Sequence, residues 1–320
     1  MSKTRRTFLQ SAALGTGASA LVAQPPAQAP PSGGQGRGQG GQGAPAGGGG
    51  RGQEEQQLTL ADLKGQVPKG KLGKMSVSRV VIGGNPIGGW AHSRDLNYVP
   101  TLMKSYFTDA KTSETLFLCE KCGINTVLAD PRLIPKIQYH WKQGGKIQFI
   151  SQGGNSPQSS IAAGAIAMYL QQMEGMARQG RFDDINNRLE AIRKAGVPAG
   201  LCVHSLEGFT LCVEKGIKPD FWMKTFHQSN YPSFQQAGDS KWCVDADQTI
   251  EFMQAQTIPW IAFKTMAAGA IQPKAGFDYA FQNGADFIAA GMFDWQVISN
   301  ANTAIEVLAG VKDRKRPWCS

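Results

Sequence analysis

Residues 113–130 read SETLFLCEKCGINTVLAD, and this stretch contains a unit that recurs along the chain. Ser113–Lys121 has its apolar residues at helical spacing, Ile124–Leu128 is a short apolar run of strand type, and Asp130 follows closely. A strand followed by a helix, repeated along a chain, is typical of a parallel sheet with crossover helices. The pattern therefore indicates an α/β protein.

The same alternation extends over about 260 residues from Leu58, close to the roughly 250 residues of a typical (β/α)8 barrel. The predicted strands are Val77–Ile82, Ile124–Leu128, Ile147–Ile150, Ala165–Leu170, Ala199–Val203, Phe221–Met223, Trp260–Phe263 and Phe287–Ala290. The predicted helices are Ser113–Lys121, Asp183–Ala195, Leu206–Lys215, Asp247–Gln256 and Asn302–Ala309. A doubly wound sheet is the competing architecture. Eight units without a glycine fingerprint after the first strand favour a (β/α)8 TIM barrel.

The N-terminal part differs in composition from the rest. Arg5 and Arg6 precede a modestly apolar stretch, Phe8–Val22, which resembles a twin-arginine export signal. Twelve of the 20 residues from Gly33 to Gly52 are glycine, which is typical of a flexible tether. We therefore predict a signal peptide at 1–23, a disordered linker at 24–56 and a barrel domain at 57–320. The expected partner is the twin-arginine export machinery, and the expected location is periplasmic or secreted.

The charge excludes one class of partner. Residues 1–52 hold five cations and no acid, so the rest of the chain carries only +4 of the total charge of +9. This excess is dispersed along the chain, whereas nucleic-acid binding usually needs a basic stripe. The sequence also contains no run of about 18 apolar residues, so we expect no stable membrane span. The predicted partner is a small-molecule substrate.

Polar residues follow the predicted strands, at the end of the barrel where chemistry occurs in this fold. The candidate catalytic residues are Asp130, His204, Lys224, His227 and Lys264. The candidate substrate-binding residues are Asn85, Trp90, His92, Arg94, Gln152 and Asp294. For either histidine the alternative is a hydrogen-bonded structural residue, and for either lysine it is an ion pair with Asp130 or Asp294.

Three segments carry a resemblance to a known family. VSRVVIGGNPIGG at 77–89 and EKCGINTVLAD at 120–130 look like the opening of the aldo/keto reductase barrel. IPWIAFKTMAAG at 258–269 is similar to the seventh strand and following turn of that family. The resemblance implies an oxidoreductase that uses NADP(H) and a tetrad of Asp, Tyr, Lys and His, with Asp130 as the aspartate.

The sequence departs from the family at the other tetrad positions. The tyrosine position falls in Pro131–Pro135, the lysine position at Ser151 or Gln152, and the histidine position at Gln171 or Gln172. GMFDWQ at 291–296 also differs from the phosphate-recognising segment of the family. We therefore expect NADP(H) to bind weakly or not at all.

Two other chemistries fit the polar residues. Asp130, His204, His227 and Asp294 form a ligand set suited to a divalent metal, which would polarise a carbonyl or hydroxyl group. Lys224 or Lys264 would act as a base or form a Schiff base. The sequence thus predicts an exported enzyme of oxidoreductase class that acts on a small carbonyl or carbohydrate-like compound. The alternatives are a metal- or lysine-assisted sugar isomerase, epimerase or lyase, and an inactive binding protein.

Overall fold

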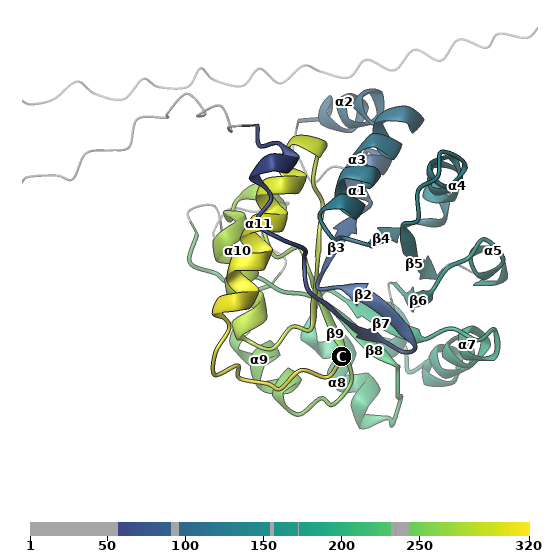
Figure 1. The fold of residues 1–320 in the computed structure, drawn as a ribbon. Coiled ribbons are helices and arrows are strands. Elements are labelled where there is room, and N and C mark those ends of the chain that lie inside the picture. The colour runs from purple at the N-terminus through teal and green to yellow at the C-terminus, as the bar shows by residue number, and fades with distance from the viewer. Residues whose placement is uncertain (1–56, 91–95, 154–156, 172, 232–233, 235–242) are drawn as a thin grey trace, which may run out of the picture. The chain divides into compact units, whose positions relative to one another are not determined.

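Eight parallel strands close the barrel that the sequence predicts. The computed structural model describes residues 57–90, 96–153, 157–171, 173–231, 234 and 243–320, all within one compact unit, Glu55–Ser320. The strand order around the barrel is β10-β3-β4-β5-β6-β7-β8-β9 (Figure 1). The strands are β3 (Val80–Gly83), β4 (Thr126–Ala129), β5 (Gln148–Gly153), β6 (Ala167–Leu170), β7 (Ala199–Val203), β8 (Phe221–Thr225), β9 (Trp260–Phe263) and β10 (Phe287–Ala290). The predicted (β/α)8 TIM barrel is confirmed.

Helices surround the barrel (Figure 1). They are α1 (Asn85–Gly88), α2 (Val99–Tyr106), α3 (Asp109–Lys121), α4 (Ile134–Lys142), α5 (Pro157–Ala162), α6 (Met173–Arg178), α7 (Phe182–Lys194), α8 (Leu206–Glu214), α9 (Ala246–Gln254), α10 (Pro273–Gln282) and α11 (Asp294–Gly310), with short 3-10 turns η1 (Leu60–Asp62), η2 (Pro131–Leu133) and η3 (Ala267–Gly269). The five predicted helices correspond to α3, α7, α8, α9 and the second half of α11. Within the described residues no helix is long and apolar enough to cross a membrane.

Some predictions fall on residues that the structure does not describe. The predicted signal peptide and linker lie within residues 1–56, outside the described residues, and His92 and Arg94 also lie outside them.

Alternate residues of each strand face the barrel lumen. The lumen-facing core residues are Val81, Ile150, Ala167, Tyr169, Cys202, Phe221, Met223, Ile261, Phe287 and Ala289. The residues between them pack against the helices in a separate, larger apolar cluster. Gly200 also faces the lumen, where a Cβ atom would lie 2.4 Å from the ring of Phe221. A glycine at this position is therefore what lets that ring fill the lumen.

The first predicted strand, Val77–Ile82, is divided between two sheets. Val77 belongs to β2 (Met75–Ser78), which pairs with β1 (Lys69–Leu72) in an antiparallel hairpin, and the barrel strand β3 begins at Val80. The break lies at Arg79, whose backbone N–H donates to Pro68 O rather than to the barrel ladder. Leu72 and Val77 pack against the lumen residues, so the hairpin covers the N-terminal end of the barrel.

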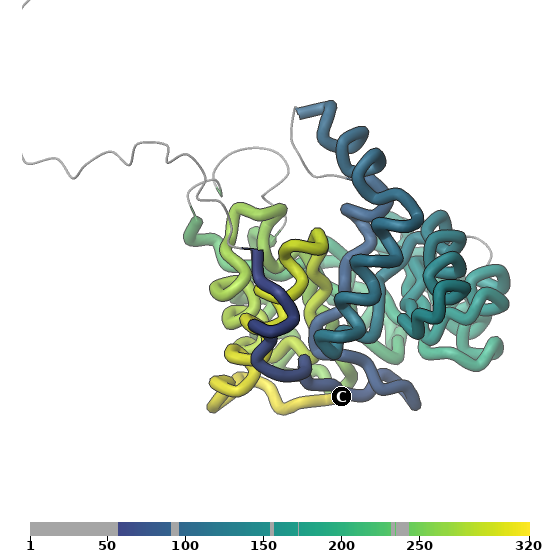
Figure 2. The backbone as a smooth tube through the Cα atoms, turned by 45° about the horizontal axis from the view of Figure 1, so that its top comes forward, coloured from purple at the N-terminus to yellow at the C-terminus, as the bar shows by residue number. Residues whose placement is uncertain are grey.

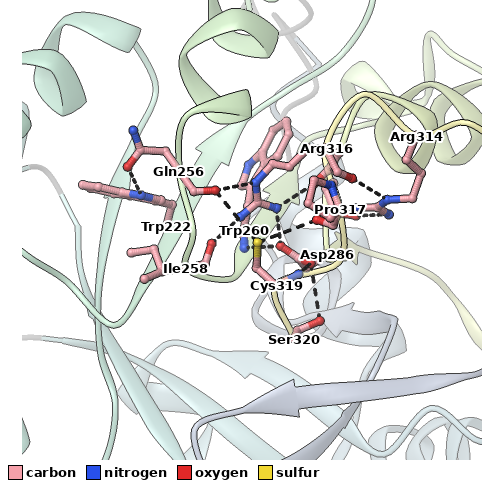
Figure 3. Close-up of polar contacts among 12 residues, drawn as sticks. Trp222, Gln256, Ile258, Trp260, Asp286, Arg314, Arg316, Pro317, Cys319 and Ser320 are labelled. Carbon is pink, nitrogen blue, oxygen red and sulfur yellow. Dashed lines mark hydrogen bonds and ion pairs between the residues drawn. The ribbon is translucent and has the colours of Figure 1, made fainter.

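The C-terminal segment runs beside the hairpin across the same end of the barrel (Figure 2). Its anchor is Arg316, whose guanidinium is fully buried and lies 2.6 Å from the Asp286 carboxylate. Arg316 also donates to the carbonyls of Gln256, Ile258 and Gly284 (Figure 3). Because every nitrogen of this guanidinium has an acceptor, the C-terminal segment is fixed at the end of the barrel where β9 and β10 begin.

Candidate functional site

The mouth, which we define as the lumen-facing residues at the C-terminal ends of the strands, is polar. Asp130, Gln152, His204 and Thr225 each lie two positions beyond a residue that contacts the lumen, so they continue the same face. Tyr169 also faces the lumen, and the strand register pairs it directly with Gln152 on β5. The structure therefore brings together the candidate residues Asp130, Gln152 and His204. It adds Thr225 and Tyr169, which the sequence analysis did not name.

Tyr169 is the distinctive residue of this group. Its side chain is only 5% exposed, and its hydroxyl has no hydrogen-bond partner among the described residues. Burial raises the pKa of this phenol well above its ordinary value, and the nearby Cys202 and Asp130 raise it further. The phenol therefore stays protonated at neutral pH. The fully buried polar atoms that have no partner in the described part of the chain do not include this hydroxyl, so it keeps some access to solvent, where it is placed to donate to an acceptor atom on a ligand.

Asp130 is held by Arg132 at the rim of the mouth. Its carboxylate accepts from the Arg132 backbone N–H at 2.9 Å and from the guanidinium at 2.8 and 3.0 Å. The side-chain hydrogen bond from Arg132 is the main reason that the pKa of Asp130 is lowered. The same guanidinium lies 4.3 Å from the ring centroid of Trp90, which packs against Gly88. The ring of Trp90 thus already contacts Arg132 and Gly88. Asp130 is an ionised carboxylate, because its pKa is lowered.

His204 lies at the mouth beside β8. Its Nδ1 atom is 2.7 Å from Thr225 Oγ1, and its ring centroid lies 5.4 Å from that of Phe263. The backbone N–H groups of His204 and Ser205 donate to the Glu174 carboxylate, which places the imidazole at the start of α8. His204 brings an imidazole to the mouth, and an imidazole is the side chain that enzymes most often use to transfer protons.

Lys224 does not face the mouth, because it lies one residue from the lumen-facing Met223. The side chain points to the helical layer, is fully buried, and lies 3.2 Å from the Asp245 carboxylate. Asp245 also accepts from the Leu206 N–H at 2.9 Å. Burial alone would raise the pKa of Asp245, but the charge of Lys224 holds that pKa below its usual value. Lys224 therefore forms its ion pair with Asp245, and not with Asp130 or Asp294 as the sequence analysis expected for a structural lysine.

Both ring nitrogens of His227 contact the backbone. Its Nδ1 lies 2.8 Å from Gln228 O, and its Nε2 accepts from the Cys243 N–H at 3.1 Å. This pair of contacts assigns the proton to Nδ1. Burial is the main cause that lowers the pKa of His227, so the ring is neutral at pH 7. Through these two hydrogen bonds the imidazole links the backbone just after β8, at Gln228, to the backbone just before α9, at Cys243.

We expect His227→Ala to lower the free energy of unfolding by about 1–3 kcal/mol, because the buried Cys243 N–H loses its acceptor. The effect should shrink as the pH falls from about 7 to about 5. The depressed pKa means that the neutral ring stabilises the native state above the unfolded pKa, and this stabilisation is lost in acid. Urea titrations of both proteins at several pH values measure this difference. A constant difference across that range would contradict the assignment.

Lys264 directly follows β9 in a strained backbone segment. Its φ is 58°, and Ala267 and Ala268 have φ values of 44° and 56°, all in the left-handed region. Such conformations in residues with a side chain are costly and cluster at functional sites. Burial lowers the pKa of His227, and the charge of Lys264 lowers it further. Burial raises the pKa of Cys202, and the charge of Lys264 offsets part of that rise. Lys264 therefore lies near both.

The remaining candidates are dispersed. Asn85 is exposed at the start of α1, and Gln152 is half-buried in the mouth. Asp294 begins α11 and accepts from Tyr106 Oη at 2.5 Å and Lys111 Nζ at 3.3 Å, both from the helical layer. In the described part of the chain no group of three or more His, Cys, Asp and Glu residues could hold a metal ion. The set of Asp130, His204, His227 and Asp294 is therefore not assembled there.

The sequence reading missed Tyr169 and Glu174 because it examined the residues just after each predicted strand. Tyr169 is within the predicted strand Ala165–Leu170 and would be found only by assigning its alternate residues to the lumen. Glu174 and Asp245 carried no signal, since their contacts with α8 join segments about 30 to 40 positions apart.

Comparison with known proteins gives the same fold. No family model and no curated protein matches the chain. Two solved structures from Pseudomonas aeruginosa, each named "putative aldo-keto reductase", are 16% identical to it. One match covers 78% of this chain and 99% of the other, with a TM-score of 0.56, and the second covers 77% and 99%, with a TM-score of 0.54. At this identity the likeness shows an aldo-keto reductase-like barrel fold.

Proposed function

We propose that this protein is an enzyme that acts on a small carbonyl or carbohydrate-like compound bound in the barrel mouth. The observation that carries the proposal is the Tyr169 hydroxyl in the barrel lumen, which has no hydrogen-bond partner among the described residues. A protonated phenol in a low-dielectric lumen polarises a carbonyl oxygen by hydrogen bonding. His204 and Gln152 line the same mouth, where they would orient the rest of the substrate. The fold likeness favours the oxidoreductase class.

A proton-transfer reaction is the second candidate, and the environment of Tyr169 favours it. The register neighbour of Tyr169 is Gln152, one of the two positions, with Ser151, at which the resemblance would place the lysine of the family. Burial, with smaller contributions from Cys202 and Asp130, raises the pKa of Tyr169, so the phenol is a hydrogen-bond donor rather than a proton source. In this reaction the substrate is an α-hydroxy carbonyl compound. His204 takes the proton from the hydroxyl-bearing carbon and returns it to the former carbonyl carbon, while the hydroxyl proton passes to the former carbonyl oxygen and Tyr169 stabilises the enediolate by hydrogen bonding.

The test separates these two reactions with one panel of small aldehydes, ketones and aldoses. In D2O, proton transfer incorporates deuterium beside the carbonyl, which 1H NMR detects without added cofactor. Hydride transfer instead requires NADPH or NADH, whose absorbance falls on oxidation. We expect deuterium incorporation with at least one compound and no NADPH consumption above the blank. Micromolar NADPH affinity with turnover would favour the reductase, and inactivity in both assays would overturn the proposal.

We also propose that the protein is exported by the twin-arginine machinery to the periplasm or beyond, with Arg5 and Arg6 as the recognition pair. Replacing both arginines with lysine keeps the charge but removes the paired guanidinium groups. We expect the double variant to remain in the cytoplasm as the uncleaved precursor. Cell fractionation and intact mass measure this outcome, with Arg37→Lys and Arg51→Lys as the matched control. Unchanged secretion of the double variant would refute the export proposal.

A further inference from the structure

The N-terminal end of the barrel, opposite the mouth, carries exposed lysines from two segments that lie far apart in the sequence. One is the hairpin of β1 and β2, and the other is the C-terminal segment, which runs beside it (Figure 2). Arg79, which follows the hairpin, donates to Ser320 Oγ and so joins the two segments. The exposed lysines of this surface, which we call the basic end, are Lys69, Lys71, Lys74, Lys312 and Lys315.

The basic end concentrates the positive charge of the domain. Residues 69–79 contain four cations and no acid, and residues 311–316 contain four cations and one acid. This excess is larger than the charge of +4 that residues 53–320 carry, so the rest of the domain is net negative. In the described part of the chain none of the five lysines forms an ion pair, and the buried Asp286 at this end is already bound by Arg316. The fold thus gathers into one surface a charge that the sequence disperses.

A role at helix ends does not account for these lysines. Lysine is common in the last turn of a helix, where its charge interacts favourably with the helix dipole, as Lys194 does at the end of α7. The five lysines of the basic end instead lie on a two-stranded hairpin, its turn and a segment without helix. Their charge is therefore available to an anionic partner outside the chain.

Two apolar side chains are exposed on the same segments. Met75 on β2 is 36% exposed, and Trp318 on the C-terminal segment is 39% exposed. The centroid of the Trp318 ring lies 3.9 Å from the guanidinium carbon of Arg79 and 3.3 Å from that of Arg314. Tryptophan is enriched at the interface between lipid and water, where its ring lies at the level of the headgroups. Lysines beside exposed apolar side chains are typical of proteins that bind to a membrane surface.

The contacts within the basic end favour a lipid surface over a nucleic acid. Recognition of nucleic acids relies on the guanidinium fork of arginine and on aromatic rings that stack with bases. Here Arg316 is bound to Asp286, and Arg79 and Arg314 lie over the Trp318 ring, where a base would stack. The exposed lysines remain, and their flexible ammonium groups attract anionic headgroups without a defined geometry.

We infer that the basic end docks on a lipid surface with anionic headgroups, so that the mouth faces away from the membrane. The lysines supply the electrostatic attraction, and Met75 and Trp318 enter the headgroup layer. The net negative remainder of the domain favours the same orientation, because an anionic surface repels it. Such docking needs no membrane-spanning helix, and the inference is independent of the proposed function.

Vesicle sedimentation with the full chain tests the attraction. We expect the protein to bind vesicles of phosphatidylglycerol and phosphatidylcholine in equal parts, and not vesicles of phosphatidylcholine alone. Binding should fall as sodium chloride rises from about 0.05 to about 0.5 M, because salt screens the lysines. Lys71→Gln with Lys74→Gln should weaken binding about 10- to 30-fold. Lys104→Gln with Arg188→Gln, at exposed positions on α2 and α7, is the matched control and should weaken it less than about twofold.

Three outcomes of this experiment would overturn the inference. One is an equal loss of binding in the two double variants, and another is equal binding to both kinds of vesicle. The third is tighter binding to duplex DNA than to the anionic vesicles at the same salt concentration, which would assign the basic end to a nucleic acid. Residues 1–56 are identical in all these proteins, so any binding by that segment cancels in the comparison of variants.

Quenching of tryptophan fluorescence by brominated phosphatidylcholine, mixed into the anionic vesicles, tests the orientation. We expect Trp318→Phe to remove a large part of the quenching, because the Trp318 ring is the one placed among the headgroups. Trp295→Phe is the matched control and should leave the quenching unchanged. Trp295 is similarly exposed, at 37%, but it lies in the first turn of α11, next to the C-terminal end of β10. Quenching that is lost in Trp295→Phe and retained in Trp318→Phe would place the mouth on the membrane and contradict the inference.

Discussion

Replacing Arg316 with methionine should lower the free energy of unfolding by about 3–5 kcal/mol. The Arg316 side chain is fully buried, and its Nη1 atom lies 2.6 Å from the equally buried Asp286 carboxylate (Figure 3). Methionine fills part of the volume but leaves that carboxylate without its cation. Three backbone carbonyls that accept from Arg316 also lose their donor. Urea denaturation measures the loss.

Two further variants make this experiment specific. Lys315→Met changes the exposed neighbouring side chain and should alter the unfolding free energy by less than about 0.5 kcal/mol. The double variant Asp286→Asn with Arg316→Met buries no isolated charge, so it should be more stable than Arg316→Met alone. If Arg316→Met costs less than about 1 kcal/mol, the ion pair is not what anchors the C-terminal segment.

Replacing Tyr169 with phenylalanine should reduce the exchange rate or turnover of the active compound by about 10²–10⁴-fold. The variant removes only the hydroxyl that we assign to the substrate oxygen, and the ring keeps its packing in the lumen. Because this hydroxyl has no hydrogen-bond partner among the described residues, stability should change by less than about 1 kcal/mol. Steady-state rates and thermal unfolding of the same preparations measure the two effects.

Tyr279→Phe is the matched control for this substitution. Tyr279 lies on α10, where its ring stacks on Phe226 at 5.0 Å in the helical layer, and burial raises the pKa of its phenol to about 12. Loss of this hydroxyl should leave the rate unchanged. A Tyr169→Phe variant with wild-type activity would show that the lumen phenol is not used in catalysis.

Most of the barrel was predictable because its signal is local. All eight predicted strands overlap barrel strands, and Ala199–Val203, Trp260–Phe263 and Phe287–Ala290 have the observed bounds. The largest departure is Val77–Ile82, whose apolar residues are interrupted by Ser78 and Arg79 and which the structure divides at Arg79 between the hairpin and the barrel. The backbone N–H of Arg79 is taken by Pro68, a contact that the apolar pattern does not encode.

The candidate site was predictable only in part. Asp130, His204 and Gln152 do lie at the mouth, because the position after a barrel strand is set by the strand itself. Lys224 satisfies the same rule, yet it faces the helices, since a shift of one residue along a strand reverses the side. His227 also follows a strand, but its ring nitrogens contact Gln228 and Cys243.

The sequence by itself determined the architecture, since the alternation of short buried strands and amphipathic helices depends on neighbouring residues. Only the tertiary structure decided which polar groups meet. Tyr169 lies beside Gln152 through strand register, Glu174 and Asp245 cap α8 from other segments, and Arg316 reaches Asp286 across 30 positions. These placements depend on strand register and chain closure. Burial makes the ion pair of Arg316 and Asp286 important, because a charge removed from water is costly unless the fold brings it a partner.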